Sequence, residues 1–215
     1  MDSITVYSDL IGSIPAKKQS TVVKKTVWSR FSYNNEIEKT LCGSTDKVEL
    51  SREDVLTEND IVRKLIMVLM WGYPNGGRGN NIEHIISKID DLKNLVLSVN
   101  GQNLTKDQAK QKIAEFSKIP GLGASTWSKI LYFFNVSIDS RRCQIYDLKI
   151  VDSLNNKQFA ELNLQQKWKQ SIKHYYQYIE LMDTLATNMS VSPEQLEIFM
   201  FYFNLSYKFT EKSKC

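Results

Sequence analysis

A Pro-Gly-Leu-Gly turn and one downstream aspartate are the residues of this chain whose types and spacing could do chemistry. The turn lies within residues 119–125, Ile-Pro-Gly-Leu-Gly-Ala-Ser, and Asp147 follows twenty-two residues after Ser125. Gly121 and Gly123 can both adopt a positive φ without a steric penalty. A helix that starts directly after such a turn exposes unpaired backbone N–H groups, which bind phosphate. The pattern predicts a phosphate-binding helical hairpin followed by a carboxylate that could act on the bound molecule.

Helical patterns flank the turn on both sides. Thr105 and Gln108 have the spacing of a capping box, which predicts a helix that begins at Lys106. Apolar residues then recur at helical spacing up to the turn, and a second apolar stripe runs from Trp127 to Phe134. These flanks support the interpretation of the turn as the tip of a helical hairpin.

Positive charge is concentrated around this hairpin. Residues 106–142 hold seven lysines and arginines against three acidic residues, an excess of four. The whole chain holds 28 lysines and arginines against 24 acidic residues, which is the same excess. Basic charge beside exposed N–H groups favours a polyanion such as nucleic acid.

In these features the chain resembles the helix-hairpin-helix base-excision DNA glycosylases, and the nearest pattern is the 8-oxoguanine DNA glycosylase branch. The resemblance is carried by residues 119–123, the helix that follows them, and residues 145–154 around Asp147. A second match, at residues 79–85, is similar to the branch's Asn-rich loop and helix. Together the matches lie within residues 60–155. The resemblance implies an all-α, two-lobed helix-hairpin-helix glycosylase fold with a DNA-binding cleft between the lobes.

The resemblance also implies a role for each site residue. Asp147 is the expected catalytic residue. DNA backbone binding is expected of Gly121, Leu122, Gly123, Ser125 and Lys129. Filling of the gap left by a flipped base, or contact with its partner base, is expected of Arg78, Asn80, Asn81 and His84.

Two departures from the family pattern bear on the activity. Ser125 stands where members that also cut the DNA backbone carry a lysine, and a serine cannot form a Schiff base. We therefore expect a monofunctional enzyme that hydrolyses the N-glycosidic bond and leaves an abasic site. If the protein has lyase activity, Lys129, one turn beyond Ser125, is the first candidate for the amine nucleophile. The loop also has Gly79 where the branch has its first Asn, and His84 where it has an Arg that reads the partner base. The substrate is thus either an oxidised purine, as in repair, or a hypermodified base of phage DNA, as in antiviral defence.

Each functional interpretation has an alternative. Residues 119–125 could simply join two helices, and Asp147 could simply cap the helix that begins beside it, because Asp is a preferred N-cap. Asp139 and Asp152 are the rival acids. The chain as a whole could be a non-catalytic helix-hairpin-helix DNA-binding module.

Cysteine and histidine usage argues against metal and cofactor chemistry. Cys42, Cys143 and Cys215 are odd in number and lack CxxC spacing, which is typical of a reducing cytoplasm. The iron–sulfur cluster of some relatives needs four cysteines, so it is excluded. His84 and His174 lie too far apart in sequence for a metal-site motif. We expect no metal and no organic cofactor.

The resemblance implies that the protein binds double-stranded DNA containing a modified base, and we expect a cytoplasmic monomer. A pI of about 8.8 is mildly basic. The longest apolar run, residues 65–71, is much shorter than the ~20 residues of a membrane span. The N-terminus lacks a charged-then-apolar leader. With 215 residues and 42% hydrophobic content, the chain can form one compact core or two small lobes.

The expected lobes are a central one at residues 60–123, which ends in the hairpin, and a second one at residues 1–59 plus 124–215, which carries Asp147. No alternation is long enough to predict a sheet, although residues 20–27 hint at a strand. A Gly-rich loop is expected at residues 72–79. Helices are expected at about residues 34–41, 60–71, 81–97, 106–117, 125–135, 146–154, 163–186 and 193–206, the last after a Ser192–Gln195 capping signal.

Overall fold

The computed structural model describes residues 3–31, 34–41, 46–155, 159–162, 164 and 171–212. It is 62% helix and 9% strand, so the predicted helical class is confirmed in its main part. The expectation of no sheet is wrong, because two small sheets are present. Their strands are at most five residues long, which leaves little alternation to detect, although the strand indicated at residues 20–27 is present at Ser20–Lys24.

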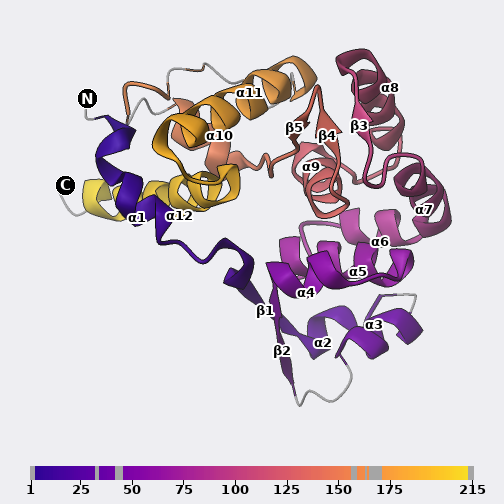
Figure 1. The fold of residues 1–215 in the computed structure, drawn as a ribbon. Coiled ribbons are helices and arrows are strands. Elements are labelled where there is room, and N and C mark those ends of the chain that lie inside the picture. Colours follow the sequence, from indigo (N-terminus) through magenta and orange to yellow (C-terminus); the bar gives the residue numbers. More distant parts are fainter. Residues whose placement is uncertain are drawn as a thin grey trace. The chain divides into compact units, whose positions relative to one another are not determined.

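The chain divides into two compact units (Figure 1). The middle unit comprises residues 17–143, and the terminal unit comprises residues 1–16 and 144–215. These boundaries differ from the expected lobe at residues 60–123. The reason is that α5 (Ile61–Gly72) packs against two helices outside residues 60–123. These are α3 (Asn34–Leu41), which precedes that range in the sequence, and α9 (Ala124–Phe133), which follows it. The cleft between lobes stays a prediction.

The middle unit contains helices and both sheets. Its remaining elements are β1 (Ser20–Lys24), α2 (Lys25–Trp28), β2 (Lys47–Ser51), α4 (Arg52–Thr57), α6 (Asn81–Ile86), α7 (Ile89–Leu97), β3 (Asn103–Leu104), α8 (Lys106–Phe116), β4 (Ser137–Ile138) and β5 (Arg141–Arg142). β1 and β2 pair antiparallel from Ser20↔Ser51 to Lys24↔Lys47. β4 pairs parallel with β3 and antiparallel with β5.

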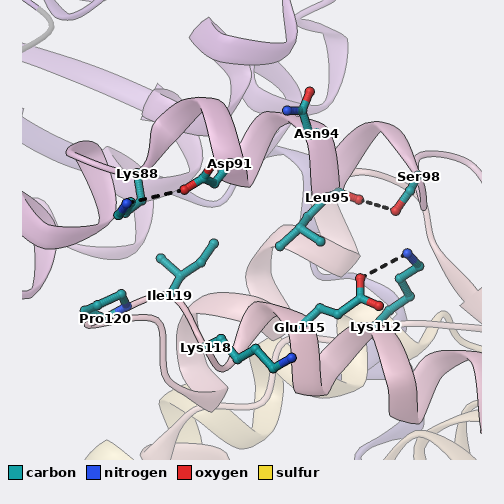
Figure 2. Close-up of a pocket in the computed structure, with 10 residues that line it drawn as sticks. All are labelled: Lys88, Asp91, Asn94, Leu95, Ser98, Lys112, Glu115, Lys118, Ile119 and Pro120. Carbon is teal, nitrogen blue, oxygen red and sulfur yellow. Dashed lines mark hydrogen bonds and ion pairs between the residues drawn. The ribbon is translucent and has the colours of Figure 1, made fainter.

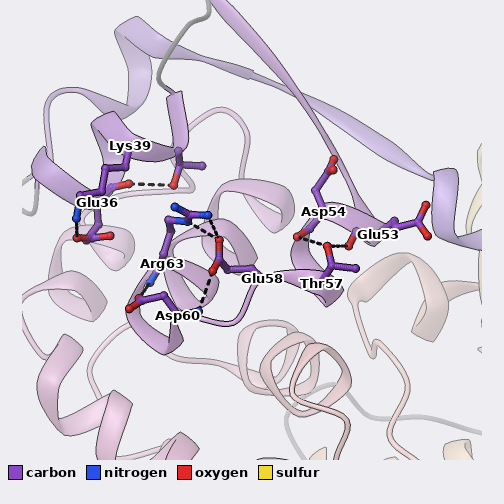
Figure 3. Close-up of polar contacts among 9 residues, drawn as sticks. Glu36, Lys39, Glu53, Asp54, Thr57, Glu58, Asp60 and Arg63 are labelled. Carbon is purple, nitrogen blue, oxygen red and sulfur yellow. Dashed lines mark hydrogen bonds and ion pairs between the residues drawn. The ribbon is translucent and has the colours of Figure 1, made fainter.

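Helix α5 forms the core of the middle unit. All its side chains from Lys64 to Met70 are buried. Asp60 caps the helix by accepting a hydrogen bond from the N–H of Arg63 at 2.8 Å (Figure 3). Glu58 also holds this end of the helix, because it pairs with the Arg63 guanidinium.

The single helix expected at residues 81–97 is two helices, α6 and α7. Both bury apolar residues, Ile82, Ile85 and Ile86 in α6 and Ile89, Leu92 and Val96 in α7. These positions continue one helical periodicity across the break at Ser87 and Lys88. The break is therefore invisible in the apolar pattern.

The terminal unit is built on long C-terminal helices. Its elements are the 3₁₀ turn η1 (Ile4–Tyr7), α1 (Ser8–Gly12), α10 (Leu148–Asn155), α11 (Ser171–Met189) and α12 (Pro193–Lys212), and the 3₁₀ turn η2 (Ala16–Lys18) lies at its junction with the middle unit. α12 packs against α1, α10 and α11. The Ser192–Gln195 cap is confirmed, with reciprocal hydrogen bonds of 2.9 and 3.2 Å. Residue 163 and residues 165–170 of the expected helix at 163–186 lie outside the described residues, as do Cys42 and Cys215.

Within the part of the chain that the structure describes, no helix is long and apolar enough to cross a membrane.

Candidate functional site

The turn of the predicted hairpin joins α8 to α9. Gly121 adopts a φ of +84°, as expected, whereas Gly123 adopts a φ of −83° and precedes α9 as its N-cap. Only Gly121 therefore uses the positive φ that a glycine permits. The Leu122 N–H donates to the Ile119 carbonyl at 3.1 Å, and the Leu122 side chain is buried. Leu122 thus stabilises the turn, and its N–H group is already used.

The first amides of α9 face a solvent-accessible end of the helix. The N–H groups of Thr126 and Trp127 donate to the Gly123 carbonyl at 2.9 and 3.0 Å. The N–H groups of Ala124 and Ser125 have no acceptor among the described residues. A Cβ placed on Gly123 would meet no atom within 4 Å. This end of α9 therefore offers free donors, a positive helix dipole and room for an anion.

The hairpin turn lies directly against the start of α6. A Cβ placed on Gly121 would lie 2.6 Å from the carbonyl oxygen of Asn81 and 2.9 Å from its Cα. Only glycine fits at this distance. The structure thus brings together two of the sequence motifs, the hairpin and the Asn-rich segment, which are about forty residues apart in the chain.

The Gly-rich loop before α6 presents its polar residues to solvent. Gly76, Gly77 and Gly79 all adopt a positive φ, between 56° and 78°. The four residues expected to fill the base gap or contact the partner base, Arg78, Asn80, Asn81 and His84, are all exposed. Asn80 occupies the N-cap position of α6, but its side chain makes no capping hydrogen bond. Its amide is therefore available to a ligand.

Lys129 is buried, with an exposed fraction of 4%. Its Nζ donates to the Ser125 hydroxyl at 2.5 Å and to the Ser125 carbonyl at 3.1 Å, and it lies 5.5 Å from the centroid of the Tyr73 ring. The lysine stem occupies space left by Gly72, where an added Cβ would lie 2.8 Å from Lys129 Cδ. Lys129 is thus buried and hydrogen-bonded to Ser125, and its expected contact with the DNA backbone stays a prediction.

Ser125 is consequently held as a hydrogen-bond donor. An ammonium group can only donate, so the Ser125 oxygen accepts from Lys129 and its own hydrogen points elsewhere. Thr126, the next residue, bonds through its hydroxyl to that of Tyr73 at 2.6 Å. These contacts fix the first turn of α9 to the end of α5.

Asp147 belongs to the terminal unit and caps α10. Its Oδ1 accepts hydrogen bonds from the N–H groups of Lys149 at 3.0 Å and Ile150 at 3.1 Å. Asp147 is half-buried, and its Oδ2 has no hydrogen-bond partner among the described residues. The capping role is thus present, but it uses one carboxylate oxygen and leaves the other for a ligand.

Tyrosines from α11 anchor the segment that leads to Asp147. The Tyr175 hydroxyl donates to the Gln144 carbonyl at 3.0 Å, and the Tyr178 hydroxyl donates to the Ile145 carbonyl at 2.8 Å. Tyr146 is fully buried against both rings, with centroid distances of 5.8 and 5.2 Å, and burial raises the pKa of its phenol to about 12. Tyr175 and Tyr178 are themselves buried in the core.

The aromatic residues at the C-terminal end of the chain pack partly beside this site. Nζ of Lys149 lies 4.1 Å from the centroid of the Phe201 ring in α12. The backbone N–H of the same lysine donates a hydrogen bond to Asp147. Phe199 is buried and packs with Phe203 at 5.3 Å between centroids.

Neither rival acid has the geometry of Asp147, which caps a helix start through one carboxylate oxygen, Oδ1. Asp139 lies at a positive-φ position between β4 and β5 and pairs with Lys106 at 3.7 Å. Asp152 lies within α10, where its carboxylate cannot cap the helix start.

A cavity of about 570 Å³ lies between α7 and the end of α8, beside the hairpin (Figure 2). Two of its lysines are already paired, Lys88 with Asp91 at 3.6 Å and Lys112 with Glu115 at 3.1 Å. Both carboxylates in the cavity are thus neutralised, so it lacks a free acid for catalysis. Among the described residues no group of His, Cys, Asp or Glu is arranged to hold a metal ion.

Sequence reasoning missed Arg30, which lies against the Gly-rich loop. A Cβ placed on Gly76 would lie 2.8 Å from a guanidinium nitrogen of Arg30 and 3.0 Å from Val27 Cγ1. No pattern near residue 30 indicated this contact, because it depends on the tertiary fold.

A model of the family described as "Putative 8-oxoguanine DNA glycosylase OGG-like protein" matches residues 15–201 of the chain. Searches of curated proteins and of solved structures returned no match.

Proposed function

Because this chain belongs to the OGG-like family of 8-oxoguanine DNA glycosylases, we propose that it is a monofunctional DNA glycosylase. It flips a modified base out of duplex DNA and hydrolyses the N-glycosidic bond, leaving an abasic site. The observation that carries this proposal is the carboxylate of Asp147, which caps α10 through Oδ1 and keeps Oδ2 without a partner among the described residues.

The hairpin supplies the grip on the DNA backbone. A phosphate binds at the N-terminus of α9, where the N–H groups of Ala124 and Ser125 and the Ser125 hydroxyl are available donors. The buried ammonium of Lys129 adds positive charge behind this site without touching the phosphate itself.

The Gly-rich loop stabilises the opened duplex. Moving a base out of the stack costs a free energy of about a few kcal/mol. That cost is smaller when protein side chains fill the gap that the base leaves. The loop lies beside the hairpin turn, because Gly121 contacts the backbone of Asn81. Its side chains Arg78, Asn80 and Asn81 are exposed. They are therefore suited to enter a gap next to the phosphate that the hairpin holds.

Asp147 performs the chemistry. As the bond from C1′ to the base nitrogen breaks, its electron pair leaves with the base and the sugar becomes oxocarbenium-like. A carboxylate nearby stabilises that positive charge and accepts a proton from the water that attacks C1′. The proton taken from the water passes on to the departing base nitrogen, which regenerates the carboxylate. The products are the free base and an abasic sugar bearing the water's hydroxyl group.

The reaction stops at the abasic site because Ser125 replaces the lysine that attacks the sugar in bifunctional relatives. A serine hydroxyl cannot form a Schiff base. The nearby amine of Lys129 already donates hydrogen bonds to Ser125.

The substrate is a modified base, either an oxidised purine or a hypermodified base of phage DNA. Gly79 and His84 replace residues of the branch that contact the partner base, so both classes fit. A panel of duplexes containing oxidised purines and phage-derived modified bases decides between them. Alkali treatment reveals abasic sites, and mass spectrometry identifies the released base.

A second candidate is a non-catalytic DNA-binding module, and the capping bonds of Asp147 favour it. Such a protein would bind the duplexes and release no base from any of them.

A further inference from the structure

The Gly-rich loop is held at two points, and at the second point it contacts the positively charged side chain of Arg30. At its α6 end the loop meets the hairpin turn, where Gly121 contacts Asn81. Within the loop Gly76 is buried against Val27 and Arg30. Arg30 therefore lies beside the loop at a second place, within the same unit as the hairpin.

The guanidinium of Arg30 is positioned but not neutralised. Its Cζ lies 4.8 Å from the centroid of the buried Phe31 ring, and one of its nitrogens contacts Gly76. The side chain as a whole is exposed. It forms no ion pair with any carboxylate of the described residues, in contrast to Arg63, which pairs with Glu58.

A planar guanidinium stacked on an aromatic ring keeps its edge N–H groups for an outside acceptor. An arginine fixed in this way loses little side-chain entropy when it binds. Its fork of N–H donors matches a phosphate, which can accept two parallel hydrogen bonds.

We propose that Arg30 is a DNA-binding residue that holds a backbone phosphate beside the Gly-rich loop, separate from the phosphate held by the hairpin. The inference rests on the proposed function, because it requires DNA on this face. The loop then enters the duplex between two phosphate contacts, one at the N-terminus of α9 and one at Arg30.

The test measures binding to an unmodified duplex as salt is varied, so it does not depend on base release. Arg30→Met keeps the aliphatic contacts with Gly76 and Val27 but removes the charge, and Arg30→Lys keeps the charge. Lys25→Met removes one exposed positive charge from the same segment and serves as the matched control. Arg30→Gln is a second neutral variant if Arg30→Met lowers the melting temperature.

A plot of log affinity against log salt concentration has a negative slope. Loss of one phosphate contact reduces the magnitude of that slope by about 0.9. We expect that change for Arg30→Met and Arg30→Gln, with Arg30→Lys and Lys25→Met close to wild type. Equal slopes for Arg30→Met and wild type would overturn the proposal, and so would an equal decrease for Lys25→Met, which would indicate a general charge effect.

The same measurements separate this inference from the proposed function. A wild-type protein that binds duplex DNA with the Arg30-dependent slope but releases no base would refute the glycosylase and leave the Arg30 contact standing. A wild-type protein without salt-dependent DNA binding would overturn both.

Discussion

Gly121 and Gly123 look equivalent in the turn, yet they have different roles. Gly121 has a φ of +84° and no space for a Cβ, which would lie 2.6 Å from the Asn81 carbonyl. Gly123 has a φ of −83°, and space is open beside it. The fold needs the first glycine. The second leaves room for a ligand at the start of α9.

Gly121→Ala should therefore destabilise the protein, whereas Gly123→Ala should not. A strained backbone conformation costs about 1–3 kcal/mol, and the contact with Asn81 adds to it. Gly123→Ala should keep the wild-type melting temperature but bind DNA roughly tenfold more weakly, because the new methyl group hinders one phosphate hydrogen bond. Thermal melting and duplex titration measure both effects. Unchanged DNA affinity of Gly123→Ala would indicate that the hairpin is only a connector.

Lys129 and Ser125 give a prediction about the products. Because the Lys129 amine is buried and hydrogen-bonded to Ser125, it should not attack the sugar. Wild-type protein should leave intact abasic strands that break only after alkali, and borohydride should trap no protein–DNA adduct. A trapped adduct that disappears in Lys129→Met would show that this lysine is a nucleophile and that the enzyme is bifunctional.

At the scale of elements, the loop of residues 73–80 is held between α2 and the hairpin. Gly76 and Gly121 mark the two contacts, and the residues between them are mostly exposed. A loop held at Gly76 and at Asn81 can present Arg78 and Asn80, which lie between these contacts, without ordering them at the moment of binding. This lowers the entropic cost of inserting them into DNA.

Replacement of Arg78, Asn80 and Asn81 by alanine should slow base release from duplex DNA more than from single strands. Their proposed role is to hold a duplex open, and a single strand does not need that help. Single-turnover rates on matched duplex and single-stranded substrates measure the difference. Equal losses on the two substrates would point to a role in the base pocket instead.

Local signals predicted the elements better than the contacts between them. The Thr105–Gln108 capping box is present, and α8 begins at Lys106 as expected. These features depend on a few neighbouring residues. The contact of Gly121 with Asn81, and the burial of Lys129 against Gly72, depend on segments far apart in the chain, so no local pattern could reveal them.

At the scale of the whole molecule, the candidate residues are divided between the two units. The middle unit carries the hairpin and the Gly-rich loop, and the terminal unit carries Asp147. Asp147 depends on a buried support, since Tyr175 and Tyr178 bind the carbonyl groups just before it. Stability of the terminal unit is thus a condition for catalysis.

This support gives a prediction about alkaline pH. Burial raises the pKa of Tyr146 from 10.0 to about 12, so the folded state holds the phenol proton more tightly than the unfolded state. The stability that this provides is complete below pH 10 and is lost as the pH rises from about 10 to about 12. Tyr146→Phe should therefore lose less stability than wild type between about pH 8 and about pH 11 in urea unfolding. An equal loss would show that Tyr146 is not the group responsible.

The central claim is that Asp147 is the catalytic residue, and the rate of base release by Asp147→Asn tests it most directly. Asparagine caps a helix about as well as aspartate, so the fold should survive. Loss of the negative charge should slow base release by orders of magnitude, because the oxocarbenium-like sugar loses its stabilising carboxylate. DNA affinity should stay equal or rise, since a carboxylate repels phosphates.

Asp139→Asn and Asp152→Asn remove the same charge from the rival positions and should release the base at close to the wild-type rate. The account predicts an Asp147→Asn protein that is folded, binds DNA and is inactive. An Asp147→Asn protein that releases the base at a near-normal rate would contradict it.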